Sequence, residues 1–315
     1  MNKINLISIK EYLLLHSRLC RRLVYLRDKR SALRDPKKEA SRVYKRSFGH
    51  DIRWDNPQDL NEKISWLQFN TDTSLWSRCA DKYAVRGYVE ECGLSNLLVK
   101  LYGKWDKAED VDFSQLPSKF VLKSNNASGT VIVVKDKSKI DEKKIRKTMK
   151  EWLKYEFGYY SADLFYTKIK PCLIAEEFLE DDNNKISASL IDYKIWCFNG
   201  EPECVWVAYD RRPGKPVKMA LFDLNWNPLN QHLLSGPHYA LDINDKIERP
   251  SSLNEMLDAC RKLAKPFKEV RVDFYDIKGK PYFGELTFTS GYGFYTDDYY
   301  NYLGSKIDLS DIKKE

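Results

Sequence analysis

The segment RVDFYDIKGKPYFGELTFT, residues 271–289, carries charged and polar side chains where a hairpin would bring them together. If its two arms pair as antiparallel strands, Asp273 can stand opposite Glu285, and the same register pairs Arg271 with Thr287. Opposed Cβ atoms lie about 5 Å apart, and like charges at that separation destabilise a sheet. Something cationic should therefore lie between the two acids, and carboxylate oxygens are ligands that Mg²⁺ prefers.

This register requires a loop with an odd number of residues, centred on Gly279. A two-residue Lys278-Gly279 turn would shift the pairing by one and send Glu285 to the other face. We therefore expect an odd-length loop. Arg271 would then lie on the same face, where it could neutralise charge on a transferring phosphoryl group. Taken alone, two acids on a hairpin more often form a wet outer face, with Arg271 as a surface partner.

A second stretch suits phosphate binding. In KFVLKSNNASGT, residues 119–130, Lys123 ends a predicted strand just before a loop of small polar residues. The stretch is not a Walker A motif, because the order of glycines and lysine is wrong and a strand follows. Free backbone N–H groups in such a loop can still cover phosphates, which the lysine reaches as a point charge. Most loops of this kind only turn the chain.

The segment IAEEFLED, residues 174–181, is a predicted strand that ends in acidic residues. Backbone groups at a strand exit can pair with the edge of an adenine, and an acidic side chain there can hold ribose hydroxyls. An ordinary capped strand end is the simpler interpretation of the segment by itself. It indicates a nucleotide hinge only in combination with the other motifs.

These side chains need a framework of strands and helices to position them. Residues 1–70 are predicted to be mostly helical, with breaks at Pro36 and Pro57. The dipeptide Asn199-Gly200 is the strongest hairpin signal in the chain. Further helices are predicted at 81–92, 141–158 and 252–267, and further strands at 119–123, 131–136 and 172–181. Strand pairs that alternate with single helices indicate α+β lobes packed face to face.

Composition limits the class of protein and its partners. The chain has 315 residues, 43% of them hydrophobic and 13% aromatic, which is enough for a real core. Its seven cysteines are scattered without a Cys-x-x-Cys pair, which suits a reducing cytoplasm better than a zinc or redox motif. The net charge of +7 arises in residues 1–50, which carry +10, so residues 51–315 carry −3. We therefore expect no nucleic-acid partner.

The basic N-terminus has its own pattern. INLISIKEYLLLHSRLCRRLVYLRDKR, residues 4–30, spaces leucines at near-helical intervals with arginines between them. Its longest apolar run is four residues, against the roughly 20 that span a bilayer, and charged residues interrupt any signal-peptide core. The pattern predicts either a basic helix on anionic lipid or an acidic partner, or a helix packed on the body with a solvated basic face.

The order of these parts resembles the TupA-like ATP-grasp family of bacterial surface-polysaccharide loci. The blocks that carry the resemblance are NPQDLNEKISWLQ, DKYAVRGYV, DFSQLPSKFVLKSNNASG, DYKIWCFNGEP and VRVDFYDIKGKPYFGELTFTSGYGF, and it runs from about residue 40 to the C-terminus. It implies an α+β ATP-grasp fold, with two lobes enclosing the nucleotide and a helical N-terminal extension. The implied divisions are a basic helical region (1–70), a small lobe (71–175) and a large lobe with the metal site (176–315).

The resemblance also implies a reaction. ATP phosphorylates a carboxylate, an amine attacks the acylphosphate, and an amide, ADP and phosphate leave. The expected cofactors are ATP and Mg²⁺, with Mn²⁺ as a substitute. The expected substrates are a small-molecule or glycan carboxylate, such as a uronic acid or other acidic acceptor, and an amine such as an amino acid, in capsule or cell-surface polysaccharide biosynthesis. The expected location is the cytoplasm, with the basic N-terminus touching the inner membrane or a polysaccharide-synthesis complex.

Residue roles follow from the same resemblance. Lys82 and Lys123 would contact ATP phosphates beneath a loop containing Ser128 and Gly129. Glu177 and Leu179 would form the adenine hinge, and Glu180 or Asp181 would meet the ribose. Asp273, Glu285 and Thr287 would form the metal site, and Arg271, Lys123 and Lys194 would act on the transferring phosphate. Asp192, Lys194 and Arg211 would address substrate or phosphate, although a cross-strand ion pair explains them almost as well. Thr287 stands where many relatives have Asn, and Asn126 where His is commoner.

Two other classes of protein remain as alternatives. A glycosyltransferase would need an Asp-x-Asp metal motif, for which the candidate is Asp110-Val111-Asp112, in a polar stretch that favours a loop. A non-catalytic nucleotide-binding module could dock through the basic N-terminus. The intact set Lys123, Arg271, Asp273 and Glu285 argues against such a module, because a decayed site should have lost at least one of them.

Overall fold

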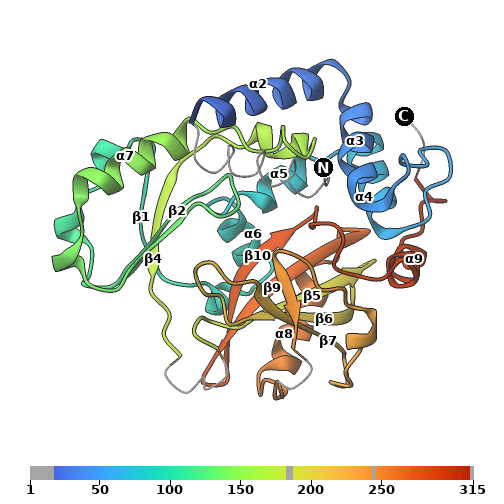
Figure 1. The fold of residues 1–315 in the computed structure, drawn as a ribbon. Coiled ribbons are helices and arrows are strands. Elements are labelled where there is room, and N and C mark those ends of the chain that lie inside the picture. Colours follow the sequence, from blue (N-terminus) through green and yellow to red (C-terminus); the bar gives the residue numbers. More distant parts are fainter. Residues whose placement is uncertain (1–17, 182–186, 243–245, 313–315) are drawn as a thin grey trace, which may run out of the picture.

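The computed structural model describes residues 18–181, 187–242 and 246–312. Two β-sheets form its framework, a four-stranded small sheet and a six-stranded large sheet, and helices pack around both (Figure 1). Among the helices of these residues, none has both the length and the apolar character needed to cross a bilayer. The architecture agrees with the predicted α+β class.

The small sheet is antiparallel, with strand order β1-β4-β2-β3. Its strands are β1 (Leu101–Trp105), β2 (Phe120–Ser124), β3 (Val131–Val134) and β4 (Leu173–Glu177). Helix α7 (Glu142–Leu153) packs Ile145 and Met149 against Phe120 and Leu122 of this sheet. The predicted lobe boundary between residues 175 and 176 falls inside β4.

The large sheet has the order β10-β9-β5-β6-β7-β8, and β7 with β8 is its parallel pair. Its strands are β5 (Asp192–Phe198), β6 (Glu201–Tyr209), β7 (Val217–Asp223), β8 (Tyr239–Leu241), β9 (Glu269–Ile277) and β10 (Lys280–Thr287). Helix α8 (Leu253–Leu263) packs on it through Met256, Cys260 and Leu263. All residues of β5 are buried, as expected for a central strand covered on both faces.

The remaining helices surround the sheets. They are α2 (Arg18–Arg34), α3 (Pro36–Phe48), α4 (Leu60–Asn70), α5 (Ser74–Ala80), α6 (Val85–Glu91) and α9 (Asp297–Ser305). Short 3₁₀ segments lie at Ser95–Leu97, Ala108–Asp110, Phe113–Gln115, Lys137–Lys139, Leu164–Lys168 (η5) and Asn230–His232. Pro36 begins α3 behind the N-cap Asp35, and Asp59 caps α4, so the predicted breaks are confirmed. Residues 4–17 of the helix predicted over 4–30 lie outside the described residues. From Arg18 onward the predicted segment is helical.

The β9–β10 hairpin corrects one prediction. Lys278 and Gly279 form a two-residue turn, with positive φ angles of 56° and 82°, so the expected odd-length loop is wrong. The pairing of Glu285 with Asp273 is nevertheless correct, because the register shifts by one between Phe283 and Glu285. Gly284 is the extra residue of this β-bulge. The bulge therefore restores the register that the short turn would have lost.

Candidate active site

Two cavities lie between the sheets. The larger, of about 660 Å³, is lined by β2, β3, the exit of β4 and residues 187–190, and the smaller, of about 270 Å³, lies over the β9–β10 hairpin. Arg211 lines both, so the two are neighbours. The predicted residues at the larger cavity are Lys123, Glu177, Leu179, Glu180 and Asp181, and those at the smaller are Lys82, Ser128, Lys194, Arg271, Glu285 and Thr287.

Strand pairing aligns the charged side chains of the smaller cavity. Lys194 on β5 is opposite Asp273 on β9, which is opposite Glu285 on β10, and Trp206 on β6 is opposite Lys194. Directly opposed residues share one face of a sheet, so these four side chains form a row. The bulge makes this row possible, because its register shift places Glu285 opposite Asp273. The extra residue is a glycine, and a Cβ on Gly284 would lie 3.0 Å from the Asp273 carbonyl oxygen.

Asp273 is buried beneath two cations. Arg271 donates from Nε to its Oδ1 at 2.7 Å and from Nη2 to its Oδ2 at 2.8 Å, and Lys194 Nζ also contacts Oδ2. The same Arg271 Nη2 lies 3.6 Å from Glu285 Oε1. The cationic charge that two opposed carboxylates require is thus supplied in part by the protein. Arg271 is predicted to act on phosphate, but in this structure its guanidinium is hydrogen-bonded to Asp273.

Glu285 faces the smaller cavity with 40% of its side chain exposed. Burial tends to raise the pKa of its carboxyl, but Lys82, Lys194 and Arg271 outweigh that effect and lower the pKa to about 2. The Thr287 hydroxyl donates to Glu285 Oε1 at 3.2 Å and accepts from Arg271 at 3.1 Å. Glu285 is therefore an ionised, accessible carboxylate at neutral pH.

Lys82 reaches the loop between β2 and β3. Lys82 Nζ donates to the carbonyl of Ala127 at 2.8 Å and lies 3.9 Å from Glu285 Oε2, and burial lowers its pKa. Ser128 and Gly129 are exposed at the tip of this loop, and Gly129 adopts a positive φ of 73°. Asn126, whose role the sequence left open, donates to the Tyr155 carbonyl at 3.1 Å.

Glu176 is a charged residue of the site that the sequence reasoning missed. Its Oε2 lies 2.6 Å from Lys123 Nζ, and its Oε1 lies 3.3 Å from Arg86 Nη1. It sits opposite Val121, two residues from Lys123 along β2, so both side chains share one face. The strand order could not be read from one sequence, although all three residues lie in segments already singled out.

Two ion pairs involve residues predicted to bind substrate or ribose. Glu180 is paired with Lys119 at 2.7 Å at the edge of the larger cavity. Asp192 is paired with Arg211 Nη2 at 2.6 Å and lies 3.9 Å from Lys194 Nζ. The ion-pair explanation of Asp192 and Arg211 is therefore present in the structure, beside the cavity-lining position of Arg211.

The donor set at the hairpin suits a hard cation. Asp273 and Glu285 stand opposite each other on one face, and Thr287 adds a hydroxyl. Both Asp273 oxygens are hydrogen-bonded by Arg271 and Lys194, whereas Glu285 faces the smaller cavity. No group of three or more His, Cys, Asp or Glu side chains gathers anywhere in the described ranges. The protein therefore supplies two carboxylates, which leaves positions for phosphate oxygens and water, as Mg²⁺ favours in nucleotide sites.

A family comparison assigns the chain to a family. The family profile named TupA-like ATPgrasp matches residues 62–308, from within α4 to beyond α9. The chain belongs to the TupA-like ATP-grasp family. All predicted site residues, from Lys82 to Thr287, lie inside the match, whereas α2 and α3 lie outside it. No curated protein sequence matches this TupA-like chain.

Solved structures that resemble this TupA-like protein are distant. The D-alanine–D-alanine ligase of Bacillus anthracis is 18% identical, with a TM-score of 0.43 over 79% of this chain and 69% of its own. The ATP-grasp ligase PsnB with a minimal precursor is 10% identical, with a TM-score of 0.41 over 78% and 68%. Phosphoribosylamine–glycine ligase of Thermotoga maritima is 13% identical, with a TM-score of 0.40 over 67% and 48%. The family match decides the assignment.

Proposed function

We propose that this protein is an ATP-dependent carboxylate–amine ligase. The observation that best supports the proposal is the row Lys194, Asp273 and Glu285, which lies over the β9–β10 hairpin at the smaller cavity. The adjoining cavity of about 660 Å³ is within the usual size range of small-molecule sites. Membership of an ATP-grasp family agrees with a nucleotide there.

ATP would lie across both cavities. Val121, Val131 and Val133 give the larger cavity an apolar wall for the adenine, next to the backbone of Glu177 and Leu179. Glu180 or Asp181 would meet the ribose. Lys123, Lys82 and the loop with Ser128 and Gly129 would then hold the phosphates. Mg²⁺ or Mn²⁺ held by Asp273, Glu285 and Thr287 would neutralise phosphate charge.

The protein itself would contribute positioned charge. The substrate carboxylate takes the γ-phosphoryl group and ADP leaves; an amine then forms the amide bond as phosphate leaves. Lys82, Lys123, Lys194 and Arg271 oppose the negative charge of these steps. No protein nucleophile is required, since the substrate supplies the attacking oxygen. None of the described cysteines lines either cavity, in keeping with that mechanism.

The proposed substrates are a uronic acid or other acidic acceptor and an amino acid or other amine, in capsule or surface-polysaccharide biosynthesis in the cytoplasm. The test is ADP release from ATP with uronic acids crossed against amino acids, followed by mass analysis of the product. We expect ADP release that depends on the carboxylate and a product mass equal to the two substrates less one water. Hydrolysis of a sugar nucleotide, with no ADP release from ATP, would instead support a glycosyltransferase.

The glycosyltransferase alternative loses support at its own motif. Asp112 caps the 3₁₀ segment Phe113–Gln115 and accepts from the backbone N–H of Ser114 at 2.9 Å. Asp110 is exposed at the end of the preceding 3₁₀ segment, and neither acid lines the two cavities between the sheets. Capping explains Asp112 without a metal.

The surface of α2 supports a peripheral membrane role. Its inner side packs on the body through buried Asp28 and Ala32, and Tyr25 donates to Glu156 at 2.5 Å. Its outer face has exposed leucines and arginines and no acidic residue. The residues of this face are Leu23, Leu26, Leu33, Arg22, Arg27, Arg30 and Arg34. In Figure 1, α2 runs along one edge of the molecule, away from the large sheet. A face of this kind suits an anionic lipid surface.

We expect the full-length protein to sediment with vesicles containing phosphatidylserine and to be released by salt. Replacing Leu23, Leu26 and Leu33 together by Ser should weaken that binding about tenfold or more, because burying each leucine in the interface is favourable. Leu234, exposed elsewhere at 45%, gives the control Leu234→Ser, which should bind like the wild type. Equal binding to neutral phosphatidylcholine vesicles, or none to either, would favour a protein partner or a solvated face.

A further inference from the structure

Asp163 is a buried carboxylate without a cationic partner. It is 9% exposed, and no lysine or arginine of the described residues forms an ion pair with it. Eight other buried acids each have a lysine or arginine within 4.0 Å, namely Asp28, Glu39, Asp59, Glu62, Glu176, Asp192, Asp210 and Asp273. Glu269 also lacks a partner, but it lines neither cavity between the sheets. Asp163 lines the smaller one.

The chain holds Asp163 in place with a strained turn. Ala162, fully buried, has a positive φ of 59°, and its carbonyl accepts from Gln68 Nε2 at 2.8 Å. Gly158 leaves room behind it, since a Cβ there would lie 2.5 Å from the Asp163 carbonyl oxygen. A non-glycine residue in this conformation costs about 1–3 kcal/mol and persists only where surrounding contacts enforce it. The turn therefore fixes the direction of the next side chain.

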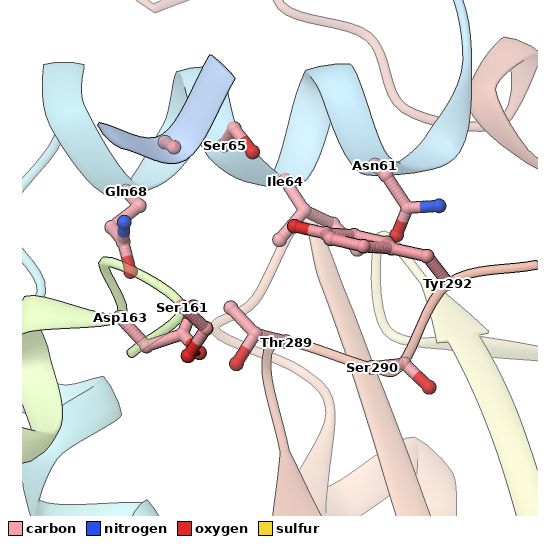
Figure 2. Close-up of a pocket in the computed structure, with 10 residues that line it drawn as sticks. Asn61, Ile64, Ser65, Gln68, Ser161, Asp163, Thr289, Ser290 and Tyr292 are labelled. Atoms are coloured by element: carbon pink, nitrogen blue, oxygen red, sulfur yellow. Dashed lines mark hydrogen bonds between the residues drawn. The ribbon is translucent and has the colours of Figure 1, made fainter. Parts of the chain in front are cut away.

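Hydroxyl groups surround the Asp163 carboxylate. Ser161 and Thr289 both donate to it, and Figure 2 shows the three side chains together beneath α4. Thr289 lies just beyond the end of β10, and the next residue, Ser290, accepts from Arg271 Nη1 at 3.0 Å. Asp163, Arg271, Glu285, Thr289 and Ser290 all line the smaller cavity. Asp163, which has no cationic partner, therefore lines the cavity in which we propose that the reaction takes place.

A third, much smaller cavity adjoins the Asp163 carboxylate. Its volume of about 10 Å³ is close to that of a single water site, and its lining is mostly polar (Figure 2). Asn61 Nδ2 and Gln68 Oε1 border it and have no hydrogen-bond partner among the described residues. The side chains that α4 contributes here, Asn61, Ile64, Ser65 and Gln68, are uncharged. These side chains place no positive charge beside Asp163. A cation that pairs with Asp163 would therefore come from the 270 Å³ cavity that the carboxylate also lines.

We propose that Asp163 binds the ammonium group of the amine substrate and takes its proton before the amine attacks the acylphosphate. The inference rests on the proposed ligase function. The ammonium group gives one proton to the carboxylate, and the neutral amine forms the C–N bond. The C–O bond to phosphate then breaks, phosphate takes the second N–H proton, and Asp163 later returns its proton to solvent. Atoms and charge balance without another reactant.

The titration of Asp163 agrees with this role. Burial raises the pKa of its carboxyl to about 7, against the opposing hydrogen bonds from Ser161 and Thr289. The titratable neighbours facing it are Tyr166 and Tyr292, and burial raises the pKa of both phenols, so they stay neutral. A base whose pKa lies near the working pH is suited to proton transfer.

The variant Asp163→Asn tests the proposal with two nucleophiles. D-glucuronate serves as the carboxylate. Hydroxylamine, neutral at pH 7.5, traps acylphosphate without losing a proton first, whereas glycine arrives as an ammonium ion. We expect the variant to keep hydroxamate formation within about threefold and to lose amide formation with glycine by about a hundredfold or more. Equal loss with both nucleophiles, or loss with neither, would overturn the role of Asp163. No hydroxamate from the wild type with D-glucuronate or with any other uronic acid or acidic acceptor would count against the ligase proposal itself.

A binding measurement needs no turnover. Methylammonium chloride at pH 8 should raise the Tm of the wild type and leave that of Asp163→Asn unchanged, while tetramethylammonium, which has no N–H, should affect neither. An equal response of wild type and variant to methylammonium, or none in either, would contradict the proposed ammonium site. Glu269→Gln is the matched control, a buried acid without a partner that lies away from the cavities. It should behave like the wild type in every assay.

Discussion

Glu285→Gln should lower ATP-dependent amide formation by about a thousandfold and leave the protein folded, an effect of the size expected when a key electrostatic group is lost. Glutamine keeps the volume and the strand position of Glu285 opposite Asp273. It removes the charge that faces Lys82, Lys194 and Arg271. It also removes one of the two carboxylates available to a cation at the hairpin. Rates of ADP release with wild type and variant at saturating substrates measure the effect.

The pH dependence of this variant has a definite sign. The pKa of Glu285 is depressed to about 2, so it is ionised throughout the usual assay range. A depressed carboxyl stabilises the folded state above the unfolded pKa of about 4.3, and that contribution disappears as the pH falls toward 2. The wild type should therefore be more stable than Glu285→Gln by the full electrostatic contribution at pH 7, and this difference in unfolding free energy should shrink below about pH 4. The loss of activity should not change between pH 6 and 9.

A matched substitution separates charge at the site from charge in general. Glu255 is exposed in the first turn of α8, on the same lobe, so Glu255→Gln should keep full activity. If Glu285→Gln retains wild-type turnover, the metal assignment at the hairpin is wrong. If the wild type binds ATP but shows no turnover with any substrate pair, a non-catalytic nucleotide-binding module becomes the better description.

The sequence was sufficient where local chemistry decides structure. The breaks predicted at Pro36 and Pro57 are present, and Asp35 and Asp59 cap the helices that follow them. Asn199-Gly200 adopts the two positive φ angles of a hairpin turn, 51° and 85°. Helix ends were less predictable. The helix expected over 141–158 ends at Leu153, and that expected over 252–267 ends at Leu263. In the second segment Pro266, which cannot continue a helix, is a stop signal that the sequence already contained.

The site itself was predicted in part, and one success rested on an error. Asp273 and Glu285 pair as expected, but through a two-residue turn and a bulge at Gly284 rather than an odd loop. Turn and bulge each shift the register by one residue, so the two cancel. An isolated glycine inside a strand pattern was an available signal for the bulge. Glu176 and Asp163 were missed because their roles arise only when segments distant in sequence come together.

Gly284→Ala should reduce ligase activity by about ten- to a hundredfold and lower the free energy of unfolding by only about 1–2 kcal/mol, as overpacking commonly does. The new Cβ would lie 3.0 Å from the Asp273 carbonyl oxygen and 3.6 Å from its Cβ. Asp273 must therefore move by a few tenths of an ångström relative to Glu285. Catalytic groups tolerate such shifts poorly, because the charge they present must be in place before reaction.

Comparing the loss of activity with the loss of stability in Gly284→Ala distinguishes a catalytic role of the bulge from a purely structural one. Gly236 is exposed, has no atom within 4 Å of an added Cβ and lacks a positive φ, so Gly236→Ala is the matched control and should change neither quantity. Urea unfolding measures stability, and ADP release measures activity. Full activity of Gly284→Ala would mean that the spacing between the two carboxylates is not critical, and a joint collapse of both quantities would mean that the bulge serves only the fold. The expected outcome, a large loss of rate with a small loss of stability, follows if the bulge exists to hold Asp273 and Glu285 at one cation.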